Sequence, residues 1–275
     1  MENKDKIYLA IDAALNAGKA IRKIYNKPTS GFEIEKKEDN SPLTLADREA
    51  HKIIMNYLKQ TPYPILSEEG KLADFESRSD WKSLWIVDPL DGTKEFIKRN
   101  GEFTVNIAWV ENQKPVIGVI YVPVSSKLYF SDLSLGAYCI ESIQSLDEYT
   151  TLDDLINASN KLPLEANRRR DEYVVVASRS HLSEEVNEYI KQLKEEGLLV
   201  KTVSVGSSLK FCLIAEGSAD CYPRFTPTME WDTAAGHAIV LATGSDVLQL
   251  STNEPLLYNK QNLINPFFLV KNTKI

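Results

Sequence analysis

Two aspartates and a tight turn follow directly on an apolar run in the segment WIVDPLDGT, which spans residues 85–93. The proline between them fixes φ at about −65° and has no amide donor, so we expect the chain to turn sharply there and place Asp88 and Asp91 on one side. Gly92 permits a positive φ, and Thr93 can begin a helix whose free N–H groups point at an anion. Carboxylate oxygens beside such a turn suit Mg²⁺ and a phosphate ester.

The same segment has a simpler interpretation as a turn. Asp-Pro and Asp-Gly are common turn dipeptides, so the motif taken alone indicates a turn as readily as a metal site. A calcium-binding EF-hand is excluded. Counted from Asp88, positions three and twelve are Leu90 and Arg99, where that loop needs acidic ligands.

Further acidic residues stand at the ends of other expected elements. Glu68 and Glu69 follow the short apolar run 65–66, and Asp232 follows Trp231 at the expected start of a helix. Each has a structural alternative, because an acid at a helix start stabilises the helix dipole and a loop acid can simply be solvated. The occurrence of three such acidic positions favours metal binding.

Asp47 lies three residues after Thr44, at the start of another expected helix. The spacing matches an N-terminal capping box, and the same carboxylate could orient or deprotonate a water; the two roles are compatible. The sequence lacks GxSxG, GxxxxGK[ST] and HExxH motifs, so we expect a water molecule to be the nucleophile. His51 and His237 are expected to be packing or surface residues.

Together these motifs resemble the lithium-sensitive, Mg²⁺-dependent phosphomonoesterases of the inositol monophosphatase superfamily. That superfamily shows a Glu-Glu pair, a WIVDP[IL]DGT run and a distant Trp-Asp at a helix start, in this order. Within it the sequence is most similar to bacterial 3′(2′),5′-bisphosphate nucleotidases of the CysQ type. The segments that carry this similarity are residues 39–42, 88–106, 178–181, 206–212 and 231–237.

The resemblance implies two Mg²⁺ ions, with room for a third. One ion would be held by Glu68, Asp88 and the carbonyl of Leu90, and a second by Asp88, Asp91 and Asp232. Glu68 would also assist the third ion. Each implied ligand is an oxygen atom, as a hard divalent cation requires.

The resemblance also implies roles in catalysis and substrate binding. Asp47 and Thr93 would orient and deprotonate the attacking water, and the backbone at Gly92 and Thr93 would cradle the phosphate. The implied substrate-binding positions are Glu68, Leu90, Asp91, Gly92, Thr93, Ser178, His181, Gly206, Lys210 and Asp232.

The implied substrate is a small nucleotide bisphosphate. Lys210 supplies a cation for a second phosphate, and Arg224 is a further candidate for that role. Phe225 stands where inositol monophosphatases carry a glutamate for ring hydroxyls, which favours a nucleotide over a polyol. The expected reaction converts adenosine 3′,5′-bisphosphate to AMP and phosphate in sulfur assimilation, with activity on the sulfated form open. The alternatives are an inositol or other sugar phosphatase, and a non-catalytic anion-binding protein.

Helical and strand patterns follow one another along the sequence and predict an α/β fold, in the α+β layered form, with helices packed on sheets. Apolar residues three and four apart predict helices at about 5–26 and from about 44 to a stop before Pro62. Strands are expected at 32–35, 84–87, 104–110, 116–122, 127–131, 173–177, 198–204 and 219–222, and helices at 184–194, 207–215 and 231–242. The resemblance implies the αβαβα sandwich of inositol monophosphatase and fructose-1,6-bisphosphatase.

We expect one compact unit made of two halves. Residues 1–141 would form an α+β half with most metal ligands, and residues 142–275 an α/β half with the substrate-binding residues and the last metal ligand. The polar stretch 142–170, which includes Arg168 to Arg170, is expected to be a solvated loop longer than usual in the family.

Composition describes an ordinary globular protein of 275 residues with a net charge of −7. The acidic balance argues against binding a nucleic acid polymer. Three cysteines without a CxxC pair favour a reducing compartment, and no signal peptide or apolar run of about 20 residues is visible. We therefore expect a cytoplasmic protein without a transmembrane segment. Peripheral association with the inner face of the cell membrane stays open, as does the choice between monomer and homodimer.

Overall fold

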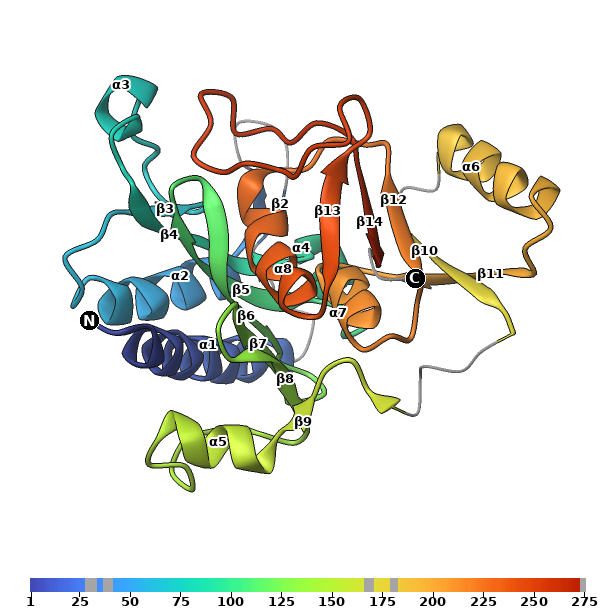
Figure 1. Cartoon of the computed structure of the whole chain (residues 1–275). Helices are drawn as coiled ribbons and strands as arrows, with labels where there is room; N and C mark the ends of the chain where they lie inside the picture. The colour runs from blue at the N-terminus through green and yellow to red at the C-terminus, as the bar shows by residue number, and fades with distance from the viewer. Residues whose placement is uncertain (28–33, 37–41, 166–170, 179–182, 273–275) are drawn as a thin grey trace.

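Five layers of helix and sheet alternate through the molecule, in the order αβαβα (Figure 1). The structure is a computed structural model that describes residues 1–27, 34–36, 42–165, 171–178 and 183–272. Alternation of amphipathic helices with apolar strands places one apolar helix face or sheet face against the next layer. The layered α/β class and the alternating sandwich are thereby confirmed.

The larger sheet has seven strands in the order β3-β4-β5-β6-β7-β8-β9. Only β3 and β4 are parallel; every other neighbouring pair is antiparallel. Their bounds are β3 Ile65–Ser67, β4 Ser83–Asp91, β5 Thr104–Glu111, β6 Lys114–Val122, β7 Lys127–Asp132, β8 Gly136–Ile140 and β9 Asn160–Lys161. Strand β4 is buried from Leu84 to Leu90, so both of its faces are covered by helices.

Helices α1 (Asn3–Tyr25) and α2 (Leu45–Leu58) cover one face of this sheet. The apolar stripe of α1 lies in one buried cluster with the indoles of Trp85 and Trp109, whose ring centroids are 4.9 Å apart. The capping box predicted at Thr44 is present, because the Thr44 amide donates to the Asp47 carboxylate and Thr44 Oγ1 accepts from the Ala46 amide. Capping fixes where α2 begins and hence where Asp47 lies.

Helix α8 (Glu230–Ala242) covers the opposite face of the large sheet, with α7 (Leu209–Ala215) beside it. The approach of α8 to β6 is close at Gly118, where an added Cβ would lie 2.2 Å from the carbonyl oxygen of Ala235. Small residues of α8 permit this contact, and Ala234, Ala235 and Ala238 are all buried. The same helix then packs on the second sheet through its other side.

The second sheet has five strands in the order β11-β10-β12-β14-β13. Strands β10, β11 and β12 are parallel to one another, whereas β13 and β14 pair antiparallel at the other edge. Its outer face packs on α6 (Glu184–Glu195). The strand bounds are β10 Tyr173–Ser178, β11 Val200–Val205, β12 Cys221–Arg224, β13 Ser245–Gln249 and β14 Phe268–Asn272.

The shorter elements depart most from the sequence-based expectations. The stretch predicted as a solvated loop contains α5 (Leu152–Ala158) and β9. Helix α5 forms because Leu152 and Leu155 are buried in the core that α1 and α2 share with the large sheet, and because Thr151 caps its N-terminus. Residues Arg168 to Arg170 lie outside the described residues. The remaining elements are β1 Ile34–Lys36, β2 Pro42–Thr44, α3 Phe75–Arg78 and α4 Thr93–Lys98.

Two observations bear on the remaining expectations. Cys139, Cys212 and Cys221 are free and buried, as packing residues would be. No helix in the described ranges is long and apolar enough to cross a membrane. The division into halves at residue 142 stays a prediction.

Candidate active site

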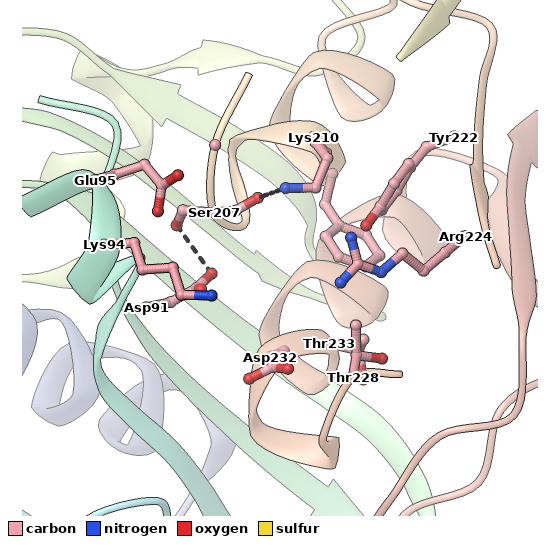
Figure 2. A pocket seen from close by; sticks show the side chains of 13 residues that line it. Asp91, Lys94, Glu95, Ser207, Lys210, Tyr222, Arg224, Thr228, Asp232 and Thr233 are labelled. Carbon is pink, nitrogen blue, oxygen red and sulfur yellow. Dashed lines mark hydrogen bonds between the residues drawn. The ribbon is translucent and has the colours of Figure 1, made fainter. Parts of the chain in front are cut away.

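A polar pocket opens between the β4–α4 turn on one side and α7, β12 and α8 on the other (Figure 2). It encloses about 590 Å³ of space, open solvent included. The lining residues come from both sheets and are Asp91, Gly92, Lys94, Glu95, Gly206, Ser207, Lys210, Phe211, Tyr222, Arg224, Thr228, Asp232 and Thr233.

The β4–α4 turn places Asp88 and Asp91 as the sequence predicts. Pairing of β4 with β5 is regular up to Asp88 and shifts register before Asp91, so the strand is irregular where the proline lies. Gly92 adopts φ +94° and precedes α4, which begins at Thr93. An alanine there would be strained in the backbone, so this turn depends on glycine. Oδ1 of Asp88 accepts a 3.0 Å bond from the Leu90 amide.

Two of the acidic residues, Asp88 and Asp232, have raised pKa values. Burial raises the pKa of Asp88 well above its ordinary value, and the charges of Glu68, Asp91 and Asp232 add to this effect. The pKa of Asp232 rises to about 8, mainly through burial and then through Asp91 and Glu68. These four residues come from β3–β4, β4 and α8 and lie near enough to interact electrostatically. The motifs alone predicted that these four residues lie together.

Asp47 and Thr93, which are far apart in sequence, meet in the structure. Thr93 Oγ1 donates to Oδ1 of Asp47 at 3.1 Å, and Oδ2 of Asp47 is held by Thr44. Asp47 is 1% exposed, and burial raises its pKa, with the charge of Glu69 adding to the rise while the bonds from Thr44 and Thr93 lower it. Asp47 and Thr93, which are expected to orient and deprotonate the attacking water, are therefore in direct contact. Their catalytic role stays a prediction.

Asp91 accepts several hydrogen bonds that sequence reasoning missed. Its Oδ2 accepts from the hydroxyls of Ser207 at 2.8 Å and Ser208 at 2.7 Å, and from Asn106 Nδ2 at 3.3 Å. These donors lie in segments that resemble the nucleotidases, but no pattern linked them to Asp91. The only available signal was the Ser-Ser pair directly before an expected helix.

Lys210 is a buried cation at the pocket wall. Its Nζ donates to the carbonyl of Ser207 at 2.5 Å and lies 5.6 Å from the Tyr222 ring centroid, and the side chain is 6% exposed. Burial lowers its pKa to about 8. Arg224 lines the same pocket and donates to the carbonyls of Thr226 and Pro227. Lys210 and Arg224 thus lie together, as a second phosphate would require.

The other predicted substrate residues are placed less completely. The amide of Gly206 donates to Glu102 at 2.8 Å, at the pocket rim. Ser178 ends β10, in register with Val205, and its side chain lies outside the described part, as does all of His181. Phe225 packs edge-on against Phe267, 6.3 Å between ring centroids, and is not among the pocket-lining residues.

The donor set fits a divalent cation. In the described ranges no three acidic, histidine or cysteine side chains already form a metal-holding cluster. Asp91 and Asp232 each have one oxygen bonded to protein donors, and the charge of Asp91 contributes to the raised pKa of Asp232. Buried oxygen ligands whose mutual repulsion raises their pKa values gain most from a bound cation, because it removes that repulsion.

The whole chain matches a known family. A family model described as the inositol monophosphatase family matches residues 3–271. The chain belongs to the inositol monophosphatase family. Magnesium dependence is general in this family. The family resemblance inferred from the motifs is confirmed.

Two curated relatives from the same family are bisphosphate nucleotidases. The chain is 45% identical over 260 residues to the 3′(2′),5′-bisphosphate nucleotidase CysQ of Escherichia coli K12, which covers 94% of this chain and 96% of the relative. It is also 45% identical over 261 residues to the CysQ nucleotidase of Salmonella typhimurium LT2, with the same coverage.

Solved structures give the same grouping. The crystal structure of CysQ from Bacteroides thetaiotaomicron, a bacterial member of the inositol monophosphatase family, is 56% identical, covers 98% of both chains and superposes with a TM-score of 0.91. The suppressor protein SuhB from Bartonella henselae superposes with a TM-score of 0.73 over 98% of this chain and 94% of its own. At 24% identity the latter shows the common fold alone.

Proposed function

We propose that the chain is a Mg²⁺-dependent 3′(2′),5′-bisphosphate nucleotidase that hydrolyses adenosine 3′,5′-bisphosphate to AMP and phosphate. The observation that carries the proposal is one pocket lined both by the carboxylates of Asp91 and Asp232 and by the buried cation Lys210. The two curated nucleotidases, 45% identical over nearly the full chain, support this substrate over others.

Each part of the site has a distinct task in this reaction. Two Mg²⁺ ions would be held by Glu68, Asp88, Asp91, Asp232 and the Leu90 carbonyl, with Glu68 available to a third. When bound, such ions polarise the phosphate, activate water and neutralise developing charge. The protein itself supplies only oxygen ligands at these positions.

Proton transfer is assigned to Asp47 and Thr93. The Thr93 hydroxyl donates its proton to Asp47, so the lone pairs of Thr93 are available to accept a proton from the attacking water. As Thr93 accepts that proton, its own proton passes to Oδ1 of Asp47. Burial raises the pKa of Asp47, which makes the carboxylate a stronger base than a solvated aspartate.

Lys210 and Arg224 are assigned to the second phosphate of the nucleotide. Both line the pocket from the side opposite Asp91 in Figure 2. A monophosphorylated polyol has no group for these cations, and Phe225 offers no hydrogen bond to ring hydroxyls. The proposed physiological role is recycling of the by-product of sulfate activation, with the sulfated nucleotide as a second substrate.

A substrate panel tests the assignment. Phosphate release with Mg²⁺ is measured for adenosine 3′,5′-bisphosphate, inositol 1-phosphate and fructose 1,6-bisphosphate. We expect the nucleotide to have the highest kcat/KM, and we expect Lys210→Ala to raise KM for the nucleotide far more than for inositol 1-phosphate.

The alternatives make different predictions for the same panel. If the nucleotide is the poorest of the three substrates, a sugar phosphatase is the better assignment. Binding of the nucleotide without any Mg²⁺-dependent phosphate release would indicate a non-catalytic anion-binding protein.

A further inference from the structure

Ser207 and Ser208, which directly precede α7, both hydrogen-bond to the carboxylate of Asp91. Ser207 Oγ lies 2.8 Å and Ser208 Oγ 2.7 Å from Oδ2 of Asp91, which is more than 110 residues earlier in the chain. Ser208 Oγ also lies 3.1 Å from the backbone carbonyl of Asp232. One hydroxyl therefore contacts a residue on β4 and a residue on α8. Figure 2 shows Ser207 between Asp91 and Lys210.

The hydrogen bonds around these two serines converge on Asp91. Asn106 Nδ2 donates to Ser208 at 2.8 Å, so the single proton of Ser208 is free to go to Asp91. Thr104 Oγ1 lies 2.5 Å from Ser207 Oγ and 3.0 Å from Asn106 Oδ1, and its one proton goes to Ser207 when Ser207 donates to Asp91. Both branches end on the same carboxylate oxygen, Oδ2 of Asp91.

The backbone of Ser207 is strained in a way that serves this contact. Its φ of +53° lies in the left-handed region, which disfavours residues with a Cβ and suits glycine. Strained residues persist where the surrounding structure holds them, and they cluster at functional sites. Here the strained conformation directs a hydroxyl at Asp91, a group that glycine lacks.

From these contacts we infer that Ser207 and Ser208 are positioning residues for Asp91. By holding Oδ2 with two hydroxyl donors and Asn106, they leave Oδ1 to face the metal site, where the described contacts give it no bond. Ser208 has one proton for two acceptors, and its shorter contact, 2.7 Å against 3.1 Å, gives that proton to Asp91 rather than to the Asp232 carbonyl. The inference rests on the proposed function, since it assigns the two serines to the Mg²⁺ site of that reaction.

The first test measures Mg²⁺ affinity of Ser208→Ala by titration calorimetry with Mg²⁺ alone. Donors that orient a metal ligand typically contribute about 10-fold to 100-fold in metal affinity, and we expect a loss in that range. Ser131→Ala is the matched control, because Ser131 is fully buried and its Oγ has no partner among the described residues. We expect the control to bind Mg²⁺ like the wild type.

The second test uses Ser207→Gly to separate positioning from stability. Glycine relieves the left-handed strain, so we expect the melting temperature of the metal-free protein to stay level or rise. Loss of the hydroxyl should nevertheless weaken Mg²⁺ binding several-fold. A residue with a purely structural role would move both quantities in the same direction.

The outcomes separate this inference from the proposed function. If the wild type binds Mg²⁺ and releases phosphate, but both serine variants bind Mg²⁺ with unchanged affinity, the positioning role is wrong. A wild type that binds no Mg²⁺ would instead overturn the proposed function. Weaker Mg²⁺ binding in both variants, with intact Ser131→Ala, supports the inference.

Discussion

At the scale of single residues, Lys210 combines deep burial with a charge that the reaction needs. Burial disfavours its ammonium form, whereas the nearby carboxylates of Asp91, Glu95 and Asp232 favour it. The result is a pKa of about 8. A phosphate binds the protonated form, so binding and protonation of this lysine favour each other.

Nucleotide affinity should therefore depend on pH above neutrality. As the pH rises through about 8, Lys210 in the free protein loses its proton, and we expect the dissociation constant for AMP to increase progressively between pH 7.5 and 9.5. Lys210→Arg keeps its charge over this range and should flatten the profile. Calorimetric titrations across the pH series measure both proteins; a wild-type profile as flat as that of the arginine variant contradicts the assignment.

Asp91→Asn tests the charge of a predicted metal ligand with little change in shape. The amide keeps one oxygen but loses the negative charge, and its nitrogen cannot accept from Ser207 and Ser208. We expect kcat at saturating Mg²⁺ to fall by about 100-fold or more. Asp153→Asn, a change at an exposed surface ion pair with Lys4, serves as the control and should leave kcat unchanged. Near-normal turnover by Asp91→Asn would remove this residue from the metal site.

At the scale of elements, the close contact between β6 and α8 sets where Asp232 lies. Gly118→Ala would place a methyl group 2.2 Å from the Ala235 carbonyl, so the helix and the sheet must separate. We expect about 3 kcal/mol of destabilisation in urea unfolding, together with weaker Mg²⁺ binding.

Gly197→Ala is the comparison for this change. A Cβ there meets nothing within 4 Å, so only the left-handed backbone, at φ +92°, is affected. We expect roughly 1–2 kcal/mol of destabilisation and normal Mg²⁺ binding. Equal destabilisation by both alanines would show that the β6–α8 contact tolerates extra volume.

Sequence periodicity predicted the long elements well because each buries a wide apolar face. Helices α1, α2, α6 and α8 and strands β4 to β7 lie within a few residues of the expected ranges. Short elements such as β8, β13 and α5 were missed or taken as loop, because their structure comes from strand pairing or from packing on the core rather than from a periodic pattern of their own.

The same distinction holds for the site. Motif order predicted which acids gather, since each stands at an element end that the layered fold brings together. The hydrogen bonds of Ser207 and Ser208 to Asp91 could not be predicted, because a contact across more than 110 residues leaves no local pattern. Lys94 and Glu95, which directly follow the motif at residues 85–93, were also missed, as was Tyr222 on the distant strand β12.

At the scale of the whole molecule, the acidic cluster makes stability depend on pH and metal together. The pKa values of Asp88 and Asp232 are raised on folding, so the folded state holds protons that the unfolded state has released. Stability of the metal-free protein from this source is complete below pH about 4 and is lost as the pH rises to about 8.

Bound Mg²⁺ should restore the stability that the metal-free protein loses as the pH rises, and we expect this stabilisation to increase with pH. Metal binding needs ionised carboxylates, so we expect Mg²⁺ to raise the melting temperature more at pH 8 than at pH 6. At a concentration 100 times its dissociation constant the ion adds about 2.7 kcal/mol of stability. Thermal melts with Mg²⁺ and with chelator measure the difference; a stabilisation that shrinks as the pH rises would contradict it.

The position of α8 between the two sheets also sets when the protein can first act during its synthesis. The large sheet is nearly complete once β8 has left the ribosome, but the helix that covers its inner face follows roughly 100 residues later. At typical translation rates of about 5–20 residues per second, that apolar face of the sheet stays exposed for about 5–20 s before α8 has been synthesised. We therefore expect chaperones to bind nascent chains in which β8 has been synthesised and α8 has not. Asp232 lies on α8, so this predicted metal ligand is added together with the helix that covers the sheet.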